Sequence, residues 1–405
     1  MSTLRVDAIR HNSATSDAIT MASDGTCTAK ITGITGGGTY SNRNKIINGD
    51  FTIHQRGGTI ASTSGNYTID RWRTYRAGGA SGGFSVQQSL SSYPQTNISG
   101  VIDNFKSSAL ITVTSAGSAD SGNNCKFQQR IEGSNVYDLA FGTVAAKKVT
   151  VSFYVKCSLT GDFGIALVNE NHNRSNVQLY TVNSASTWER KVITFDGDTS
   201  GSWDFGTGTG LQLMFDMGSG SDKHTSSLNT WVSGEKHGTS SSVKLIHTNG
   251  ATMQYAGVQL EEGSVATSFE HRNYQDELTR CYRYYYRLTG ENNKTYMIGM
   301  SDNDNVNIYG FFHFPVPMRA VMSTVEQSGN ASDYKVRRDT TQTCTGVPSL
   351  TDAWYFYARV NFPRSGHGWG TGQMLWCQGG SSSSCLLYTS PSPRDRTRSR
   401  MPSSA

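Results

Sequence analysis

The side chains best suited to chemistry in this 405-residue sequence are aromatic rings that stand beside polar loops. Residues 169–174 read Asn-Glu-Asn-His-Asn-Arg, and their amide, imidazole and guanidinium groups can hydrogen-bond to sugar hydroxyls. A tryptophan ring offers an apolar face that can stack on the C–H groups of a pyranose. Together these features predict a carbohydrate-binding surface, although each such residue taken singly is more often part of the packing. The candidate ligand-binding residues are Asn171, His172, Arg174, Trp188, Trp203, Trp231, Trp354 and Trp369.

Patterns typical of catalysis are weak. Residues 79–83 match Gly-x-Ser-x-Gly, but they lie in a Gly/Ser-rich stretch without the strand and helix of a nucleophile elbow. The histidines form no His-x-x-x-His pair, so zinc hydrolysis has no support. The local acidic pairs 196/198 and 261/262 do not suggest two carboxyl groups roughly 5–9.5 Å apart across a cleft, as a glycosidase needs. We assign no catalytic residue and expect a non-enzyme, with glycan depolymerase activity as the less favoured alternative.

Two acidic clusters have the oxygen ligands that Ca²⁺ prefers. Asp302 and Asp304 alternate with two asparagines, and Asp196 and Asp198 share a turn. The first cluster lacks the Gly and the distal Glu of an EF-hand loop, so a solvated loop is the competing interpretation. A structural Ca²⁺ is the one cofactor that we consider, and we expect no other.

The central 200 residues show the hydrophobic alternation of β-strands. Val149, Val151, Phe153 and Val155 share one face of the clearest segment. Many short strands separated by Gly/Asp/Ser/Thr turns predict an all-β chain with a β-sandwich, here of the jelly-roll type. The predicted strands are 84–90, 108–114, 125–131, 148–156, 163–169, 178–182, 189–195, 211–217, 230–232, 243–246 and 252–260.

The two ends of the chain differ from this centre. Residues 1–44 contain short β-like pieces with a hairpin turn at Asp24-Gly25, followed by a glycine hinge at 36–38. A lone hairpin is marginal in water, so this segment needs partners or stays disordered. Residues 278–285 have helical spacing and pass into a strand, and a second β region follows. Its predicted strands are 296–300, 307–314, 334–337 and 354–362.

Several motifs resemble one family of proteins. IINGDF at 46–51, QRG at 55–57 and YTIDRW at 67–72 are similar to the opening of a module in tail-fibre and minor tail proteins of tailed bacteriophages, of the marine-phage type. YAGVQLEEGSVATSFEHR at 255–272 is similar to the closing strand of that module, and CYRYYYR at 281–287 to the element that follows it. The order of segments between these motifs resembles galactose-binding-like carbohydrate-binding modules in general shape rather than in a ligand set.

The resemblance implies an organisation and a role. It divides the chain into an N-terminal shaft or attachment segment (1–44), a carbohydrate-binding-like jelly roll (45–272) and a C-terminal β tip (273–384). It implies a homotrimer in the virion tail, synthesised in the host bacterial cytoplasm, that contacts other tail proteins and attaches to host-surface glycans without catalysis. A purely structural tail component is the alternative.

Composition narrows the partners further. The last 21 residues, CLLYTSPSPRDRTRSRMPSSA, resemble a translated sequencing adapter, so we exclude 385–405 from the predicted fold; a natural basic tail is the alternative. This segment supplies +3 of the formal net charge of +5, which leaves no basic footprint for nucleic acid. No apolar stretch is long enough to span a bilayer, and we expect no membrane insertion. The seven scattered cysteines predict reduced, structural thiols.

Overall fold

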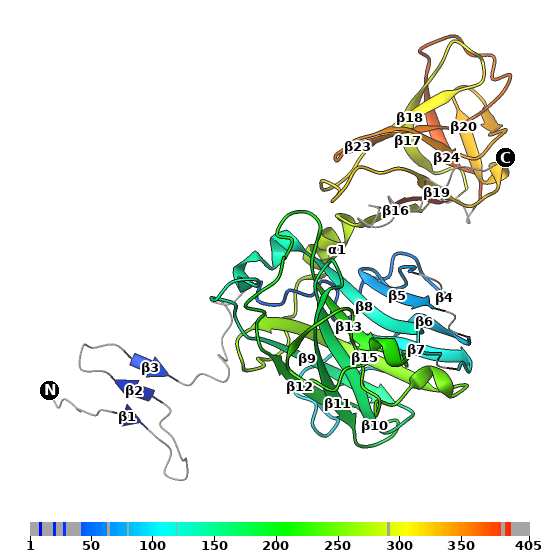
Figure 1. Cartoon of the computed structure of the whole chain (residues 1–405). Coiled ribbons are helices and arrows are strands. Elements are labelled where there is room, and N and C mark those ends of the chain that lie inside the picture. The colour runs from blue at the N-terminus through cyan, green and yellow to red at the C-terminus, as the bar shows by residue number, and fades with distance from the viewer. Residues whose placement is uncertain are drawn as a thin grey trace, which may run out of the picture.

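The structure is a computed structural model, and it describes residues 8–9, 19–21, 27–29, 42–62, 65–78, 81–118, 120–289, 292–381 and 385–389. Two β units dominate it, joined through a short helix (Figure 1). Within the described residues, no helix is long and apolar enough to cross a membrane.

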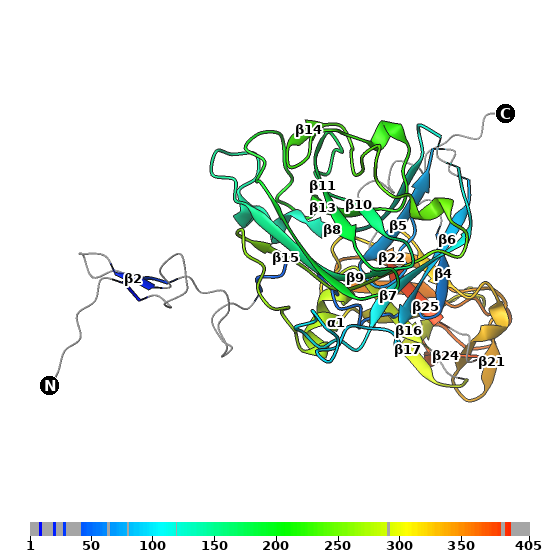
Figure 2. The same ribbon diagram turned by 90° about the horizontal axis from the view of Figure 1, so that it is seen from below.

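The larger unit is a jelly-roll sandwich of two six-stranded antiparallel sheets. In Figure 2 the central strands of the first sheet lie above those of the second. The order of the first sheet is β14 (Trp231–Ser233), β11 (Arg174–Val182), β10 (Gly161–Val168), β13 (Thr209–Asp216), β8 (Asn124–Glu132) and β5 (Trp72–Ala77). The order of the second is β12 (Glu189–Phe195), β9 (Val149–Cys157), β15 (Thr252–Glu262), β7 (Ser108–Ser115), β6 (Gly83–Ser89) and β4 (Thr59–Ala61).

Alternating apolar side chains from both sheets fill the space between them. The predicted inward row of β9 is confirmed, since Val149, Val151, Phe153 and Val155 are all buried in one core cluster. The Phe215 and Tyr255 rings lie 4.3 Å apart between their centroids. A Tyr180–Tyr255 hydroxyl pair at 2.7 Å satisfies two polar groups that the core would otherwise leave unpaired.

The smaller unit begins with α1 (Tyr274–Tyr282), where the Asn273 side chain caps the helix by accepting the Gln275 N–H. Its seven-stranded sheet has the order β21 (Thr341–Thr343), β20 (Tyr334–Arg337), β24 (Met374–Gly379), β17 (Thr295–Ser301), β18 (Ile308–His313), β23 (Tyr357–Asn361) and β22 (Ser349–Ala353). A three-stranded sheet joins β16 (Tyr285–Thr289), β25 (Cys385–Thr389) and β19 (Val325–Gln327). Short 3-10 helices lie at Gly133–Asn135, Tyr137–Leu139, Ser221–Lys223, Leu245–His247 and Ala331–Asp333.

Two predictions about elements need correction. Residues 385–389 form β25, which pairs with β16 and β19 and buries Leu386, so the excluded tail contributes at least this strand to the fold. The predicted strand at 243–246 is instead a 3-10 turn, because Leu245 and Ile246 both enter the core from a bend. The expected passage from helix to strand at 278–285 is confirmed by α1 and β16.

The N-terminal pieces form a three-stranded antiparallel sheet of β1 (Ala8–Ile9), β2 (Ile19–Met21) and β3 (Cys27–Ala29). The predicted hairpin turn at 24–25 and the hinge at 36–38 lie outside the described residues. Five cysteines are buried free thiols, as predicted: Cys125, Cys157, Cys281, Cys344 and Cys377.

Candidate functional site

The first signature motif folds around Asn48. This residue has a left-handed φ of 58°. Its side chain bonds to the backbone of Ile53 in both directions, at 2.8 and 2.9 Å, and to the carbonyl of Asp70 at 2.9 Å. Its own carbonyl accepts the indole N–H of Trp72 at 2.9 Å, and its N–H donates to Glu277. Asn48 therefore ties the opening loop, the buried Trp72 and α1 together.

The opening segment also docks along the closing strand. Lys45 N–H donates to the Leu260 carbonyl and Val258 N–H to the Gly49 carbonyl, each at 2.8 Å. Here β15 carries a bulge, with Gly257 at φ 58° and its Cα against the Phe105 ring. A Cβ on Gly49 would lie 2.0 Å from the Val258 carbonyl oxygen. The two signature motifs are thus one structural unit, although more than 200 residues separate them.

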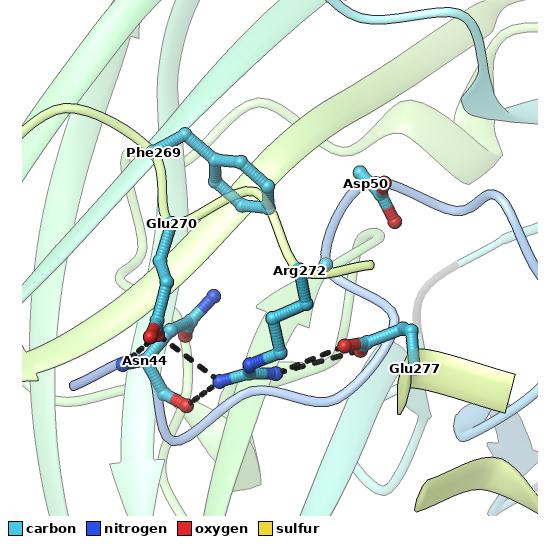
Figure 3. Close-up of a pocket in the computed structure, with 7 residues that line it drawn as sticks. Asn44, Asp50, Phe269, Glu270, Arg272 and Glu277 are labelled. Carbon is cyan, nitrogen blue, oxygen red and sulfur yellow. Dashed lines mark hydrogen bonds and ion pairs between the residues drawn. The ribbon is translucent and has the colours of Figure 1, made fainter. Parts of the chain in front are cut away.

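A small pocket lies at this contact, and Figure 3 shows Arg272 at its centre. Arg272 bonds to Glu277 at 3.1 Å, to Glu270 at 3.3 Å and to the carbonyls of Ile46 and Asn44. The cavity volume of about 10 Å³ suits a single water molecule. Glu270 and Glu277 already pair with Arg272, so these contacts hold the opening segment to the closing strand, and the pocket has no room for a sugar.

The remaining motif residues form the joint between the two units. Arg283 makes two hydrogen bonds to Glu132, at 2.6 and 2.9 Å, and the Tyr284 hydroxyl donates to the same carboxylate at 2.7 Å. The Arg71 guanidinium lies over the Tyr284 ring, 3.4 Å from its centroid. Burial opposes the charged form of Glu132, but these hydrogen bonds outweigh it and its pKa falls below its ordinary value. Burial raises the pKa of Tyr284 to about 12.

A second set of contacts holds β16 to the opening loop. Gln55 bonds to the Asp70 carboxylate through its backbone and side chain, at 2.7 and 2.8 Å. Its side chain also donates to the Tyr285 carbonyl at 3.1 Å. Arg56 lies 3.5 Å from the centroid of the Tyr285 ring, and Arg287 donates to the carbonyls of Gln55 and Arg56. The motifs therefore serve the domain joint, a role that the sequence did not reveal.

The predicted polar ligands of loop 169–174 have partners within the chain. His172 Nδ1 pairs with Glu235 at 2.8 Å, and the Arg174 guanidinium forms two bonds with Asp198, Nε at 2.9 Å. Asn171 is exposed at the tip of the same loop. Asn171 is therefore the exposed candidate of the three, whereas His172 and Arg174 are half-buried.

Glu235 is the centre of a buried charged cluster on the outer face of the first sheet. Lys126 pairs with it from β8, Lys223 donates at 2.9 Å, and Asn124 donates at 3.0 Å. Burial works against its ionisation, yet His172 and Lys126 hold the pKa of Glu235 far below its ordinary value. The cluster anchors the loop after β14 to the sheet.

The tryptophan candidates of the jelly roll pack against other hydrophobic side chains. Trp188 is 6 % exposed and lies in a cluster with Phe105 and Tyr154, so little of its ring is open for stacking. Trp203 and Trp231 meet edge to face at 5.3 Å and both pack on Phe141. Their rings are partly buried against the core.

The calcium candidates do not gather into one site. Asp196 pairs with Lys148 at 2.5 Å, and Asp198 forms an ion pair with Arg174. Asp304 accepts the backbone N–H groups of Val306 and Asn307 at 2.8 and 2.9 Å, and these bonds lower its pKa. Asp302 accepts the N–H of Asn303 in the same loop. Across the described ranges, no group of three or more His, Cys, Asp or Glu side chains could hold a metal ion.

The C-terminal candidates differ because their rings reach solvent. Trp354, Tyr355 and Phe356 form the turn between β22 and β23 and are 54 %, 38 % and 53 % exposed. The Trp354 and Tyr355 rings meet edge to face at 5.2 Å. Trp369 is half-buried and stacks on His367 at 5.5 Å. Sequence reasoning selected Trp354 and passed over Phe356, although three consecutive aromatic residues beside a strand were a visible signal.

Comparisons with known proteins add little to this geometry. No protein-family model matches the sequence, and no curated protein sequence does. Among solved structures, the enzymatically active domain of tailspike protein 4 of bacteriophage CBA120 is similar at 10 % identity and a TM-score of 0.29. That match covers 55 % of this chain and 22 % of the tailspike chain.

A second similar structure is the family 11 carbohydrate-binding module of Clostridium thermocellum, in complex with a β-1,3-1,4-mixed-linked tetrasaccharide. It has 12 % identity and a TM-score of 0.24, and covers 52 % of this chain and 98 % of the module. Scores this low identify no ligand, so the ligand class has to come from the surface of this chain.

Proposed function

We propose that this chain is a non-catalytic attachment protein of a bacteriophage tail, which binds host-surface glycans through its C-terminal unit. The observation that carries the proposal is the exposed ring run Trp354-Tyr355-Phe356 on the turn between β22 and β23. The resemblance of the motifs at 46–72 and 255–287 supports the assignment to the virion tail.

An exposed ring stacks on the apolar face of a pyranose, and each such contact contributes only about 1 kcal/mol. Repetition on several copies of the chain would convert weak contacts into firm attachment. A homotrimer is part of the proposal, because β1–β3 form a small sheet with Ile9 and Met21 both more than 40 % exposed. Three copies could cover these apolar side chains and contact other tail proteins from the same segment.

In this proposal the jelly roll holds the C-terminal unit in place. Three of the candidate ligand-binding residues in the jelly roll, His172, Arg174 and Trp188, contact other side chains of the same chain. The joint built from Glu132, Arg283 and Tyr284 favours the alternative that the whole chain is a structural spacer of the tail. A test has to distinguish glycan attachment from a purely structural role.

The test is binding of the full chain to host cells and to arrayed bacterial polysaccharides. We expect Trp354→Ala combined with Phe356→Ala to weaken binding at least 10-fold, since each ring is worth about 0.5–1.5 kcal/mol and copies multiply the loss. Tyr137→Ala is the control, because it removes an even more exposed ring from the jelly roll.

Equal binding by the double variant and the native chain would contradict the assignment to this turn. Absence of glycan binding by the native chain would leave the structural alternative. Release of reducing ends from polysaccharide would support a depolymerase instead.

A further inference from the structure

The outer face of the seven-stranded sheet exposes a continuous apolar surface. Its inner face is buried, with Met297, Leu375 and Cys377 in the core. The alternate residues of β17, β18 and β24 point outward, and their exposed fractions range from 46 % to 70 %: Ile298, Met300, Phe311, Met374 and Trp376. A monomeric soluble protein rarely leaves a contiguous surface of this kind open.

The strand register orders these side chains into a row across six strands. Trp376 is opposite Ile298, and Ile298 is opposite Phe311. Arg337 on β20 is opposite Trp376 at one end of the row. Arg359 is opposite Phe311 and Asp352 is opposite Arg359 at the other end. The row therefore reads Arg337, Trp376, Ile298, Phe311, Arg359 and Asp352 from β20 to β22.

We propose that a second copy of this chain packs face to face on this sheet, about a two-fold axis that runs along the strands between β17 and β18. Such an axis reverses the order of the row, so the first member meets the sixth, the second the fifth and the third the fourth. Arg337 then meets the second copy's Asp352, and Trp376 lies against the second copy's Arg359. Ile298 packs on the second copy's Phe311.

Each of these contacts is favourable by its chemistry. The outer pair joins opposite charges, and neither Arg337 nor Asp352 forms an ion pair with another described residue. The next pair places a guanidinium over an indole ring, the strongest type of cation–π contact. Arg359 already lies 4.8 Å from the Tyr309 ring within its own chain, so its guanidinium is on the outer face. The central pair is apolar, and aligned sheets pack in this way.

The composition of the face favours a protein surface over a sugar as occupant. Two methionines and an isoleucine lie among the rings, and such side chains adapt to protein surfaces but offer no flat stacking plane. Self-complementary charge at the two ends of one row favours a second copy over an unrelated partner. Six strands about 4.8 Å apart, with about five residues each, give a face of roughly 400 Å². That is about half of a standard interface, so the contact is weak and depends on concentration.

The test uses the full chain and measures its mass by sedimentation velocity at increasing concentration up to about 100 μM. We expect the measured mass to double as the concentration rises. The starting mass is that of the assembly that forms through the N-terminal segment. Phe311→Glu is expected to abolish the doubling. Phe205→Glu, at a similarly exposed ring in the jelly roll, is the control and should leave it unchanged.

The two-fold arrangement makes a sharper prediction for charge reversal. Arg337→Asp alone places two carboxylates opposite each other, and Asp352→Arg alone places two guanidinium groups opposite each other. Each variant should therefore associate at least 10-fold more weakly than the native chain. An equimolar mixture of the two should associate as the native chain does, because the mixed pair again has two ion pairs, one of the native sign and one with its charges exchanged.

A native chain whose mass stays constant to about 100 μM would overturn the proposal. So would doubling that survives Phe311→Glu, or a mixture that associates no better than its components. The glycan binding assigned to Trp354 and Phe356 is a separate property, and it should survive Arg337→Asp in each copy.

Discussion

Among single residues, Glu235 is the centre of the buried charged cluster on the first sheet. Its carboxylate receives Lys126, Lys223 and His172, which come from three separate parts of the chain. The Lys126 side chain is almost fully buried, and burial lowers the pKa of this ammonium to about 8 even though Glu235 opposes the shift. Each of the two charges is therefore stable only when the other is present, because either charge alone would be left in a low-dielectric site.

Glu235→Gln is accordingly expected to lower the free energy of unfolding by about 3 kcal/mol, since it leaves a buried ammonium without its counter-charge. Chemical denaturation at pH 7 measures this loss. Glu262→Gln is the control, because Glu262 pairs with Lys147 at the surface and the change should cost less than about 1 kcal/mol. A loss of similar size in both variants would show that burial of the Glu235 cluster has been overestimated.

At the scale of elements, the bulge in β15 sets the position of the opening motif. Gly257 has a φ of 58°, and a Cβ there would lie 2.3 Å from the Phe105 ring. Val258, the next residue, donates its N–H to Gly49. The glycine therefore allows the strand to bend and the opening segment to pair beside it.

Gly257→Ala is expected to destabilise the jelly roll by about 2–4 kcal/mol, from left-handed backbone strain and from the clash with Phe105. Gly122→Ala is the matched control, since its Cβ would meet only ordinary contacts of 3.6 Å or more and its φ is not left-handed. Thermal unfolding of the two variants compares them directly. An unchanged midpoint for Gly257→Ala would mean that the bulge relaxes without cost.

The elements were more predictable from the sequence than the site. β9, β12 and β20 follow local alternation, and the bounds of β12 and β20 match the prediction residue for residue. The strand prediction at 243–246 was wrong because an apolar run that enters the core from a bend has the same composition as a short strand. His172 and Arg174 look like open ligands in sequence, because their partners Glu235 and Asp198 lie 63 and 24 residues away. Pairing at that distance leaves no local signal.

For the whole molecule, the joint between the two units explains why the motifs at 46–72 and 281–287 contain so many arginines and tyrosines. Arg56 and Arg71 each cover a tyrosine ring from the C-terminal unit, while Arg283 reaches back to Glu132 on β8. Contacts run in both directions across the joint and include buried carboxylates. Such a joint fixes the orientation of the C-terminal unit relative to the jelly roll.

Acid should loosen this joint before it unfolds either unit. The pKa of Glu132 is lower in the folded chain than its ordinary value of 4.5, so its ionisation stabilises the fold above that pH. The contribution is lost as the pH falls below 4.5 and through the folded value, when the proton removes the charge that Arg283 and Tyr284 bind. Small-angle scattering should therefore report a larger radius of gyration in this acid range, while the circular dichroism of the strands persists. Glu132→Gln should produce the same expansion at pH 7, at a cost of about 2 kcal/mol because Arg283 is one-third exposed. Lys147→Met, which removes an exposed pair from the jelly roll, should leave the radius unchanged at both pH values, and expansion in that variant would point to a general effect of charge rather than to the joint.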